Sequence, residues 1–340
     1  MRVLGLLAAL LSASALWWLN HDLHPGAQAL ELAVDPGTPP RGVAQAVKDA
    51  GAKVNPLLLY GWFRLSGQSR QIRAGNYEIE PGSTPRSLLL KLVRGEESLR
   101  SVTLVEGWTF LQVRAALQKE ELLRPDTQGL APEKIMEALG VAGVPAEGRF
   151  YPDTYSYGRG TSDLALLKRA LHAMDRKLEA AWQRRQPNSP LRTPQELLVL
   201  ASIIEKETGR ASDRPMISGV FVNRLRLGMP LQTDPTVIYG MGEAFDGNLR
   251  RRDLLADTPW NTYTRRGLPP TPIAMPGWGS LQAAVQPAST QALYFVARGD
   301  GSSAFSASLE EHNRAVNKYQ RGQGPDGYSD DRQDRHLDQF

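Results

Sequence analysis

Apolar residues recur at helical spacing between Thr193 and Gly209, in the second half of the chain. Thr193 is a good capping residue, Pro194 suits the first helical position, and Glu196 follows three residues after the cap. Gly209 is a common helix stop. The pattern predicts a helix here, and the residues at helical spacing are Leu197, Leu200, Ala201, Ile204 and Thr208.

Short strand and helix patterns alternate between residues 29 and 100. Strands are predicted at residues 30–34 and 72–79, and helices at residues 42–50, 57–65 and 85–93. This β-α-α-β order followed by a helix is similar to a LysM module, a small fold that binds N-acetylglucosamine polymers. Two roles stay open for it: holding glycan, or spacing the rest of the chain from a membrane.

The remaining pattern predicts a mixed α/β domain over residues 101–320, so the fold class of the chain is α+β. Strands are expected at residues 101–105 and 294–296, with helices at 162–186, 212–227 and 309–319. Residues 232–236 are rich in turn-forming polar residues and are predicted to be a loop. Residues 321–340 are charged and poor in apolar residues, which predicts a disordered tail.

The amino-terminal segment is a mostly apolar run of residues 3–19 that follows Arg2. A helix of this length reaches about 26 Å, near the lower limit for crossing a bilayer. The pair Trp17 and Trp18 suits a membrane interface. A cleaved signal peptide is the alternative, because Ala13-Ser14-Ala15 resembles a cleavage site. We favour an uncleaved anchor over residues 1–20, and both interpretations export the rest of the chain.

Composition narrows the function. The 340 residues carry 40 basic and 36 acidic side chains, a net charge of +4, and no basic stripe with interleaved aromatics. Nucleic-acid binding is therefore not expected. The chain has no cysteine and only five scattered histidines. Together with the absence of a phosphate-binding loop, this predicts neither a metal site nor a cofactor.

Glu205 is the candidate for chemistry. It lies in the last turn of the predicted helix and borders its apolar face. Desolvation and the negative end of the helix dipole both act to raise the pKa of a carboxyl group in this position. General acid catalysis near neutral pH requires such a group. The alternative is a structural glutamate paired with an arginine, for which Arg224 is a candidate.

Several strings occur in a fixed order along the chain. They are residues 147–154 (EGRFYPDT), 201–208 (ASIIEKET), 220–225 (VFVNRL), 231–240 (LQTDPTVIYG), 261–263 (NTY), 267–270 (GLPP) and 272–274 (PIA). Together they resemble the YceG-like family of endolytic murein transglycosylases, over nearly the whole chain after residue 25. Met275 departs from the pattern, because many relatives carry a polar residue there. The family also carries a LysM-like module.

The resemblance implies that Glu205, the first glutamate of its Ile-Glu-Lys-Glu string, is the catalytic residue. It implies cleavage of the β-1,4 bond between N-acetylmuramic acid and N-acetylglucosamine, leaving a 1,6-anhydro end without consuming water. Glu205 acts as acid and then as base. The implied setting is the inner (plasma) membrane, with the catalytic domain outside the cytoplasm. Penicillin-binding synthases are the implied partners, and nascent glycan strands the substrate.

Five polar residues are candidates for sugar contacts: Asn223, Gln232, Asp234, Asn261 and Tyr263. Amides, hydroxyls and aromatic rings of this kind suit a carbohydrate. For each of them, hydrogen bonding within a loop is the alternative. Loop structure is favoured for Asp234, because an aspartate before proline often caps a turn.

Two other functions compete with the transglycosylase. A glycoside hydrolase of the same polymer requires a second carboxylate, for which Asp234 and Asp153 are candidates. Glu207 is a poor partner, because helical geometry directs it roughly 200° away from Glu205. The third possibility is a non-enzymatic glycan-binding scaffold, in which the LysM-like module carries the function.

Overall fold

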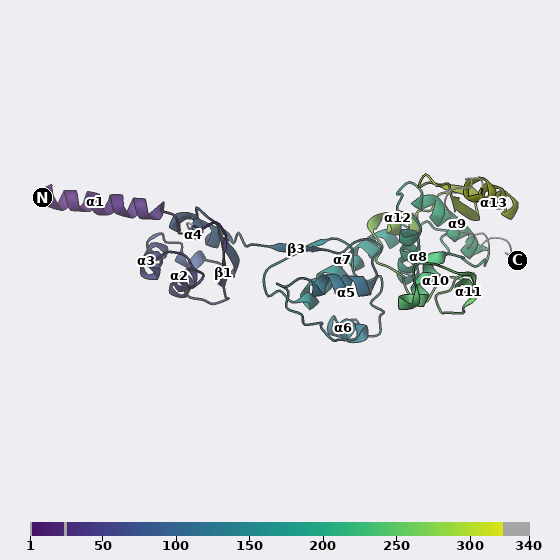
Figure 1. Cartoon of the computed structure of the whole chain (residues 1–340), viewed down its shortest axis with the longest axis horizontal. Helices are drawn as coiled ribbons and strands as arrows, with labels where there is room; N and C mark the ends of the chain where they lie inside the picture. The colour runs from purple at the N-terminus through teal and green to yellow at the C-terminus, as the bar shows by residue number, and fades with distance from the viewer. Residues whose placement is uncertain (1, 24–25, 322–340) are drawn as a thin grey trace. The chain divides into compact units, whose positions relative to one another are not determined.

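The computed structural model describes residues 2–23 and 26–321, and it divides into two compact units. The first unit runs to Ser101 and adds Leu122–Arg124 and Ser156–Thr161. The second unit contains Val102–Glu121, Pro125–Tyr155 and the chain from Ser162 onward. Both mix helices with small two-stranded sheets, which confirms the α+β class (Figure 1). Apart from Arg321, the predicted disordered tail lies outside the described residues.

The first unit contains two antiparallel strands with three helices beside them. Strand β1 (Leu30–Val34) pairs with β2 (Gly75–Ile79), so that Leu30 is opposite Ile79. The helices are α2 (Pro40–Asp49), α3 (Pro56–Leu65) and α4 (Pro85–Arg94). The predicted order is confirmed, but β2 begins at Gly75 rather than at residue 72. A short 3-10 turn at Ser69–Gln71 occupies the start of the predicted strand.

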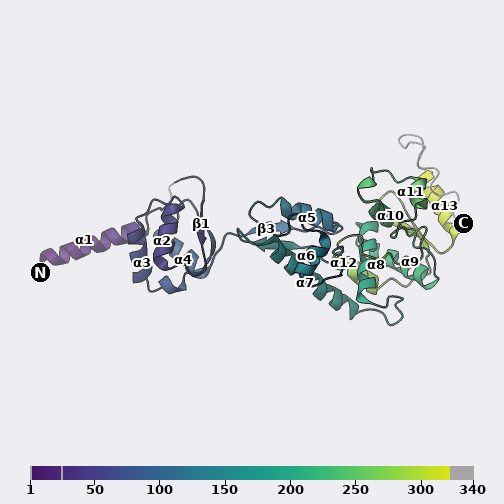
Figure 2. The ribbon, with the colours of Figure 1, turned by 90° about the horizontal axis from the view of Figure 1, so that it is seen from below.

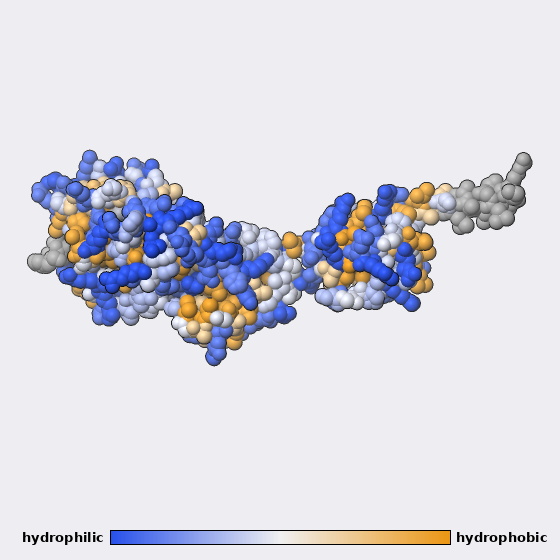
Figure 3. Space-filling view, turned by 180° about the vertical axis from the view of Figure 1, so that it is seen from behind, coloured by the Kyte–Doolittle hydropathy of each residue, from blue (hydrophilic) through white to orange (hydrophobic). Residues whose placement is uncertain are grey.

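Local sequence explains these elements. Asn55 caps α3, Thr84 caps α4 in a reciprocal capping box, and a proline begins each of the three helices. The two strands and three helices enclose one core. Its largest fully buried members are Tyr77, Phe63, Leu32, Leu59, Ile79, Leu88, Leu89 and Leu92. Apolar residues also reach the surface of this unit (Figure 3), and on α3 these are Leu57, Leu58 and Leu65.

The amino-terminal run forms helix α1 (Arg2–Leu19). Trp18 packs against the core of the first unit, and the Leu23 N–H donates to the Ser83 carbonyl at 2.7 Å. Among the helices of the described residues, none is both long enough and apolar enough to cross a membrane. The anchor over residues 1–20 therefore stays a prediction.

The second unit is mostly helical and is built around α8 (Pro194–Glu207). The predicted helix start is confirmed, since the Thr193 side chain accepts from the Glu196 N–H. The helix ends at Glu207 with Thr208 as its C-cap, so the predicted stop, Gly209, is the residue directly after the cap. All eight residues 197–204 are buried, so α8 is apolar on every side rather than on one face. The cause is the packing of α7 (Asp163–Trp182), α9 (Arg214–Arg226) and α12 (Trp278–Val285) against it (Figure 2).

In chain order, the other elements are β3 (Arg100–Thr103), α5 (Phe110–Gln118), α6 (Pro132–Ala138), β4 (Thr154–Tyr157), α10 (Asp234–Met241), the 3-10 turn Gly242–Ala244, α11 (Arg251–Leu255), β5 (Tyr294–Ala297), β6 (Ser303–Ser306), α13 (Leu309–Val316) and a final π-helical turn, Asn317–Arg321. Strand β3 pairs with β4, and β5 pairs with β6 in an antiparallel hairpin.

The loop predicted for residues 232–236 is only partly correct. The structure begins helix α10 at Asp234, with Pro235 in the first turn, because Thr233-Asp234-Pro235 is also a good helix start. The loop is confined to residues before the helix. Gln232 adopts a positive φ of 49°, alone in this among the described residues other than glycine. Its N–H donates to the Thr262 carbonyl, which ties α10 to the loop that follows α11.

Candidate active site

Glu205 lies near the carboxyl end of α8, with only 5% of its side chain exposed. Its Oε1 is 3.0 Å from Nη2 of Arg214, the first residue of α9. Its Oε2 accepts the Gly277 N–H at 2.8 Å, from the residue that precedes α12. Both oxygens are therefore held, and both interactions stabilise the ionised carboxylate.

Glu205 is paired with an arginine, as the structural alternative predicts, but the partner is Arg214 rather than the candidate Arg224. Arg224 lies ten residues further along α9, about 15 Å from Arg214 at the usual helical rise. Its guanidinium donates instead to the Leu293 carbonyl at 2.6 Å, to the carbonyls of Pro230 and Leu231, and to the Gln232 side chain. Arg224 thus holds the segments around α10 and β5 rather than the catalytic candidate.

A second carboxylate, which the sequence analysis missed, shares Arg214 with Glu205. Glu106 lies in the turn between β3 and α5, and its Oε2 is 3.9 Å from the same Arg214 Nη2. Burial raises the pKa of Glu106, the negative charge of Glu205 raises it further, and Arg214 lowers it. Of the two aspartates predicted as second carboxylates, Asp153 is exposed and its side chain accepts the Thr154 N–H, and Asp234 accepts the Tyr263 hydroxyl.

Three backbone contacts fix the turn that carries Glu106. The Gly107 N–H donates to the Met275 carbonyl at 2.9 Å, and the Met275 N–H donates to the Trp108 carbonyl at 2.7 Å. Lys206 of α8 donates to the Gly107 carbonyl at 3.3 Å. Met275 therefore contributes through its backbone, while its side chain is buried.

Three of the predicted sugar contacts line one hollow of the second unit. Gln232, Asp234 and Tyr263 surround it together with Arg224 and Glu207. The Tyr263 hydroxyl donates to Asp234 Oδ1 at 2.6 Å, and the Thr233 hydroxyl donates to Glu207. Burial raises the pKa of Glu207 to about 7. Glu207 therefore faces a different environment from Glu205, and Glu205 is not among the described residues that line this hollow.

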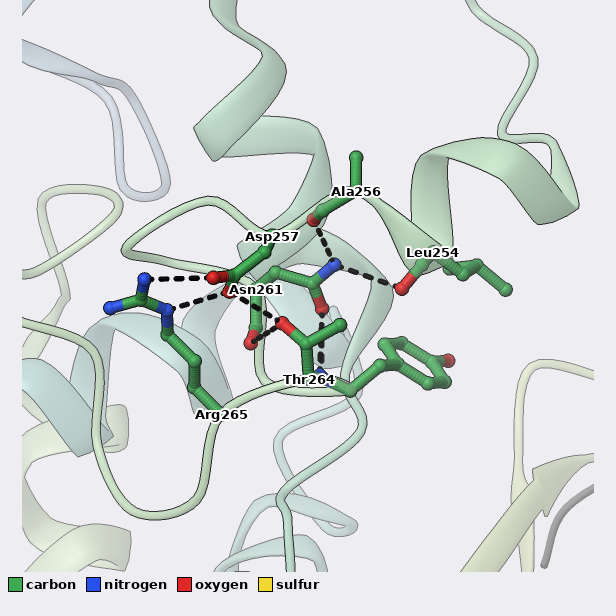
Figure 4. A network of polar contacts seen from close by, with 7 residues as sticks. Leu254, Ala256, Asp257, Asn261, Thr264 and Arg265 are labelled. Atoms are coloured by element: carbon green, nitrogen blue, oxygen red, sulfur yellow. Dashed lines mark hydrogen bonds and ion pairs between the residues drawn. The ribbon is translucent and has the colours of Figure 1, made fainter.

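The other two predicted contacts have structural hydrogen bonds. Asn261 is fully buried, and its amide nitrogen donates to the carbonyls of Leu254 and Ala256 at 2.9 and 2.7 Å. Its oxygen accepts the Tyr263 N–H at 2.8 Å (Figure 4). Asn223 donates to the carbonyls of residues 290 and 292 at 2.9 and 3.1 Å. These contacts correspond to the loop-bonding alternative for both side chains.

Glu147 is a buried carboxyl group that the sequence indicated only as part of a family string. It accepts the Phe110 N–H at the start of α5 at 3.0 Å and the Tyr239 hydroxyl of α10 at 3.1 Å. Burial outweighs these bonds and raises the pKa of Glu147 to about 7. The described residues contain no cluster of three or more histidine, aspartate or glutamate side chains that suits a metal ion.

Comparison with known proteins identifies relatives along most of the chain. The sequence profile of the YceG-like family matches residues 32–318. An endolytic murein transglycosylase of Bacillus subtilis is 32% identical over 264 residues, which cover 73% of each chain. One from Streptococcus pneumoniae is 27% identical over 76% of this chain, which spans 53% of that protein. The crystal structure of a YceG-like protein from Listeria monocytogenes has a TM-score of 0.54 and 28% identity, covering 85% of this chain and 99% of that one.

Proposed function

Because the chain belongs to the YceG-like family, we propose that it is an endolytic murein transglycosylase, a lyase that cuts within peptidoglycan strands. The bond is the β-1,4 linkage between N-acetylmuramic acid and N-acetylglucosamine, and the product keeps a 1,6-anhydro ring. The observation that carries the proposal is Glu205. Its carboxylate, in the family's Ile-Glu-Lys-Glu string, is almost closed off from solvent and is oriented through both oxygens.

In this mechanism Glu205 donates a proton to the glycosidic oxygen as its bond to C1 breaks. The resulting carboxylate then takes the proton of the C6 hydroxyl, while that oxygen forms the new bond to C1. Glu205 ends in the state in which it began, so one residue serves as acid and base and no water is consumed. Arg214 and the Gly277 N–H stabilise the carboxylate between the two steps.

The hollow beside α10 is a candidate subsite for the glycan strand. Gln232, Asp234 and Tyr263 present amide, carboxylate and hydroxyl groups along one surface, which suits the hydroxyl and acetamido groups of a sugar. The Arg224 guanidinium donates a 3.0 Å hydrogen bond to the side-chain oxygen of Gln232 and so holds that side chain in place. Asn223 and Asn261 keep these segments in place rather than contacting the sugar.

The remaining features fit an exported enzyme at the plasma membrane. Helix α1 would anchor residues 1–20, with the exposed Trp17 at the interface. Residues 29–100 would form a LysM-like glycan-binding module, and residues 101–320 the catalytic domain outside the cytoplasm. Penicillin-binding synthases that elongate nascent strands are the expected partners. Flotation of the full chain with lipid vesicles, beside a variant lacking residues 1–20, tests the anchor; equal flotation of both would refute it.

Hydrolysis is the second candidate, because Glu106 places a second carboxylate beside Glu205. Mass spectrometry of products from purified peptidoglycan strands separates the two reactions. The transglycosylase predicts anhydro ends, lighter by one water than hydrolytic products and absent when Glu205→Gln replaces the wild-type chain. Reducing ends would establish the hydrolase instead.

A further inference from the structure

The site contains an apparent conflict between its geometry and the first step of the proposed reaction. A general acid must carry a proton, yet the two oxygens of Glu205 contact a guanidinium and a backbone N–H, the partners that suit a carboxylate. The second step requires the opposite, because the ionised carboxylate must then be stable enough to form. A single arginine fixed on Glu205 serves only the second step.

Arg214 is not committed to Glu205 alone. Its Nη2 lies 3.0 Å from a Glu205 oxygen and 3.9 Å from a Glu106 oxygen, so the same nitrogen is within reach of both carboxylates. Its Nε is buried and has no hydrogen-bond partner among the described residues. An unpaired buried donor costs free energy. A rearrangement that gives the Arg214 guanidinium a further hydrogen-bond acceptor therefore costs less free energy than it would for a fully paired side chain.

Two glycines allow Glu106 and Arg214 to lie close to the backbone before and within α12. A Cβ atom on residue 277 would lie 1.7 Å from Glu106 Oε1, and one on residue 279 would lie 2.4 Å from Arg214 Nη1. The two glycines therefore clear the volume that the carboxylate and the guanidinium occupy. The side chain of Glu106 is 49% exposed, whereas that of Arg214 is 13% exposed. The backbone of the Glu106 turn is held through Gly107 and Met275, so the Glu106 carboxylate stays within reach of Arg214.

We propose that Glu106 is a positioning residue that competes with Glu205 for Arg214, an inference that rests on the proposed function of Glu205. When Arg214 pairs with Glu106, Glu205 retains the proton that it delivers to the leaving oxygen. When Arg214 returns to Glu205, it stabilises the carboxylate that has just formed. Tyr151 also lies near Glu106, whose charge raises the pKa of that tyrosine after burial and Asp153; Lys206 of α8 contacts the neighbouring Gly107 carbonyl.

The test measures kcat and KM against pH for the full chain and for Glu106→Gln. With Arg214 confined to Glu205, kcat falls about ten- to a hundredfold while KM changes little. The alkaline limb of the kcat profile moves to lower pH, because Arg214 then contacts Glu205 alone. Glu133→Gln, which removes an exposed carboxylate of α6, serves as the matched control and keeps the wild-type profile.

An Arg214→Gln background separates competition from a simple charge effect. If Glu106 acts through Arg214, then Glu106→Gln causes no further loss and no further pH shift in that background. The same loss and shift in both backgrounds would overturn the proposal, as would wild-type behaviour of the single variant. Glu106→Asp keeps a carboxylate and restores part of the rate. If Glu205→Gln is inactive while Glu106→Gln behaves like the wild type, only this inference is refuted. If Glu205→Gln is active, the proposed function itself is refuted.

Discussion

Two glutamates of the second unit, Glu147 and Glu207, have a pKa raised to about 7 by burial. Each accepts hydrogen bonds that favour its charged form, from Phe110 and Tyr239 in one case and from Thr233 in the other. Desolvation nevertheless dominates in both, and the negative charge of Asp234 raises the pKa of Glu207 further. Glu205 has a different environment, since a guanidinium contacts it directly.

Glu147 makes the stability of the fold depend on pH. Its pKa is about 7 in the folded chain against 4.5 for an ordinary glutamate. The protonated Glu147 side chain contributes its full stabilisation of the fold below pH 4.5. This contribution is lost as pH rises through about 7, because the folded state retains a proton that the unfolded chain releases. The loss has an upper limit of about 3 kcal/mol.

Glu147→Gln cannot ionise and avoids this loss. Between pH 5 and pH 8 we expect the free energy of unfolding of the wild type to fall by up to about 3 kcal/mol more than that of the variant. Denaturant unfolding of both proteins at the two pH values measures this difference. Glu207 is present in both proteins, so its own titration cancels from the difference. An identical pH dependence of the two free energies of unfolding would show that Glu147 is ionised in the folded protein.

At the scale of elements, the loop between α11 and α12 shapes one side of the hollow that contains Tyr263. Asn261 bonds to carbonyls at the end of α11 and to the Tyr263 N–H, while Asp257 and Arg265 form an ion pair at 2.8 Å beside it (Figure 4). A buried amide with this many partners is a loop-forming residue, since each lost partner leaves a buried polar group unpaired.

Asn261→Ala therefore acts first on stability. We expect a loss of about 2–3 kcal/mol in the free energy of unfolding, with reduced affinity for glycan as a consequence of the displaced loop. Asn188→Ala, at an exposed position, is the control and changes stability little. Unchanged stability of the Asn261 variant together with weakened glycan binding would instead support a direct sugar contact.

The elements were largely predictable because local signals determine them. Thr193 and Pro194 predict the start of α8, and alternating apolar residues predict β1 and β2. The start of α10 was missed because Thr233-Asp234-Pro235 suits a turn as well as a helix cap. The prediction that α8 is apolar on one face only was wrong, since all of its residues 197–204 are buried among neighbouring helices. A local sequence pattern does not reveal how many neighbours a helix has.

At the scale of the whole molecule, the site depends on residues far apart in sequence. Gly277 lies 72 residues from Glu205, and the Lys206 contact to Gly107 spans 99 residues. Periodicity and family strings identified Glu205, but neither indicates that Glu106 and Arg214 lie beside it. Only the packing of α8, α9 and the turn before α5 brings them together. The same packing separates Glu205 from the hollow that Gln232, Asp234 and Tyr263 line.

The central claim is that Glu205 is the residue that transfers the proton, and Glu207 is the natural comparison on the same helix. The most direct test is the initial rate of strand cleavage by Glu205→Gln and by Glu207→Gln, with both variants shown to be folded. The mechanism predicts a loss of about a thousandfold for Glu205→Gln, in the range expected for removing a general acid and base. It predicts a far smaller loss for Glu207→Gln, which keeps its bond to Thr233 and the shape of its hollow. A Glu205 variant that keeps its activity, or a Glu207 variant that loses it equally, would contradict the account.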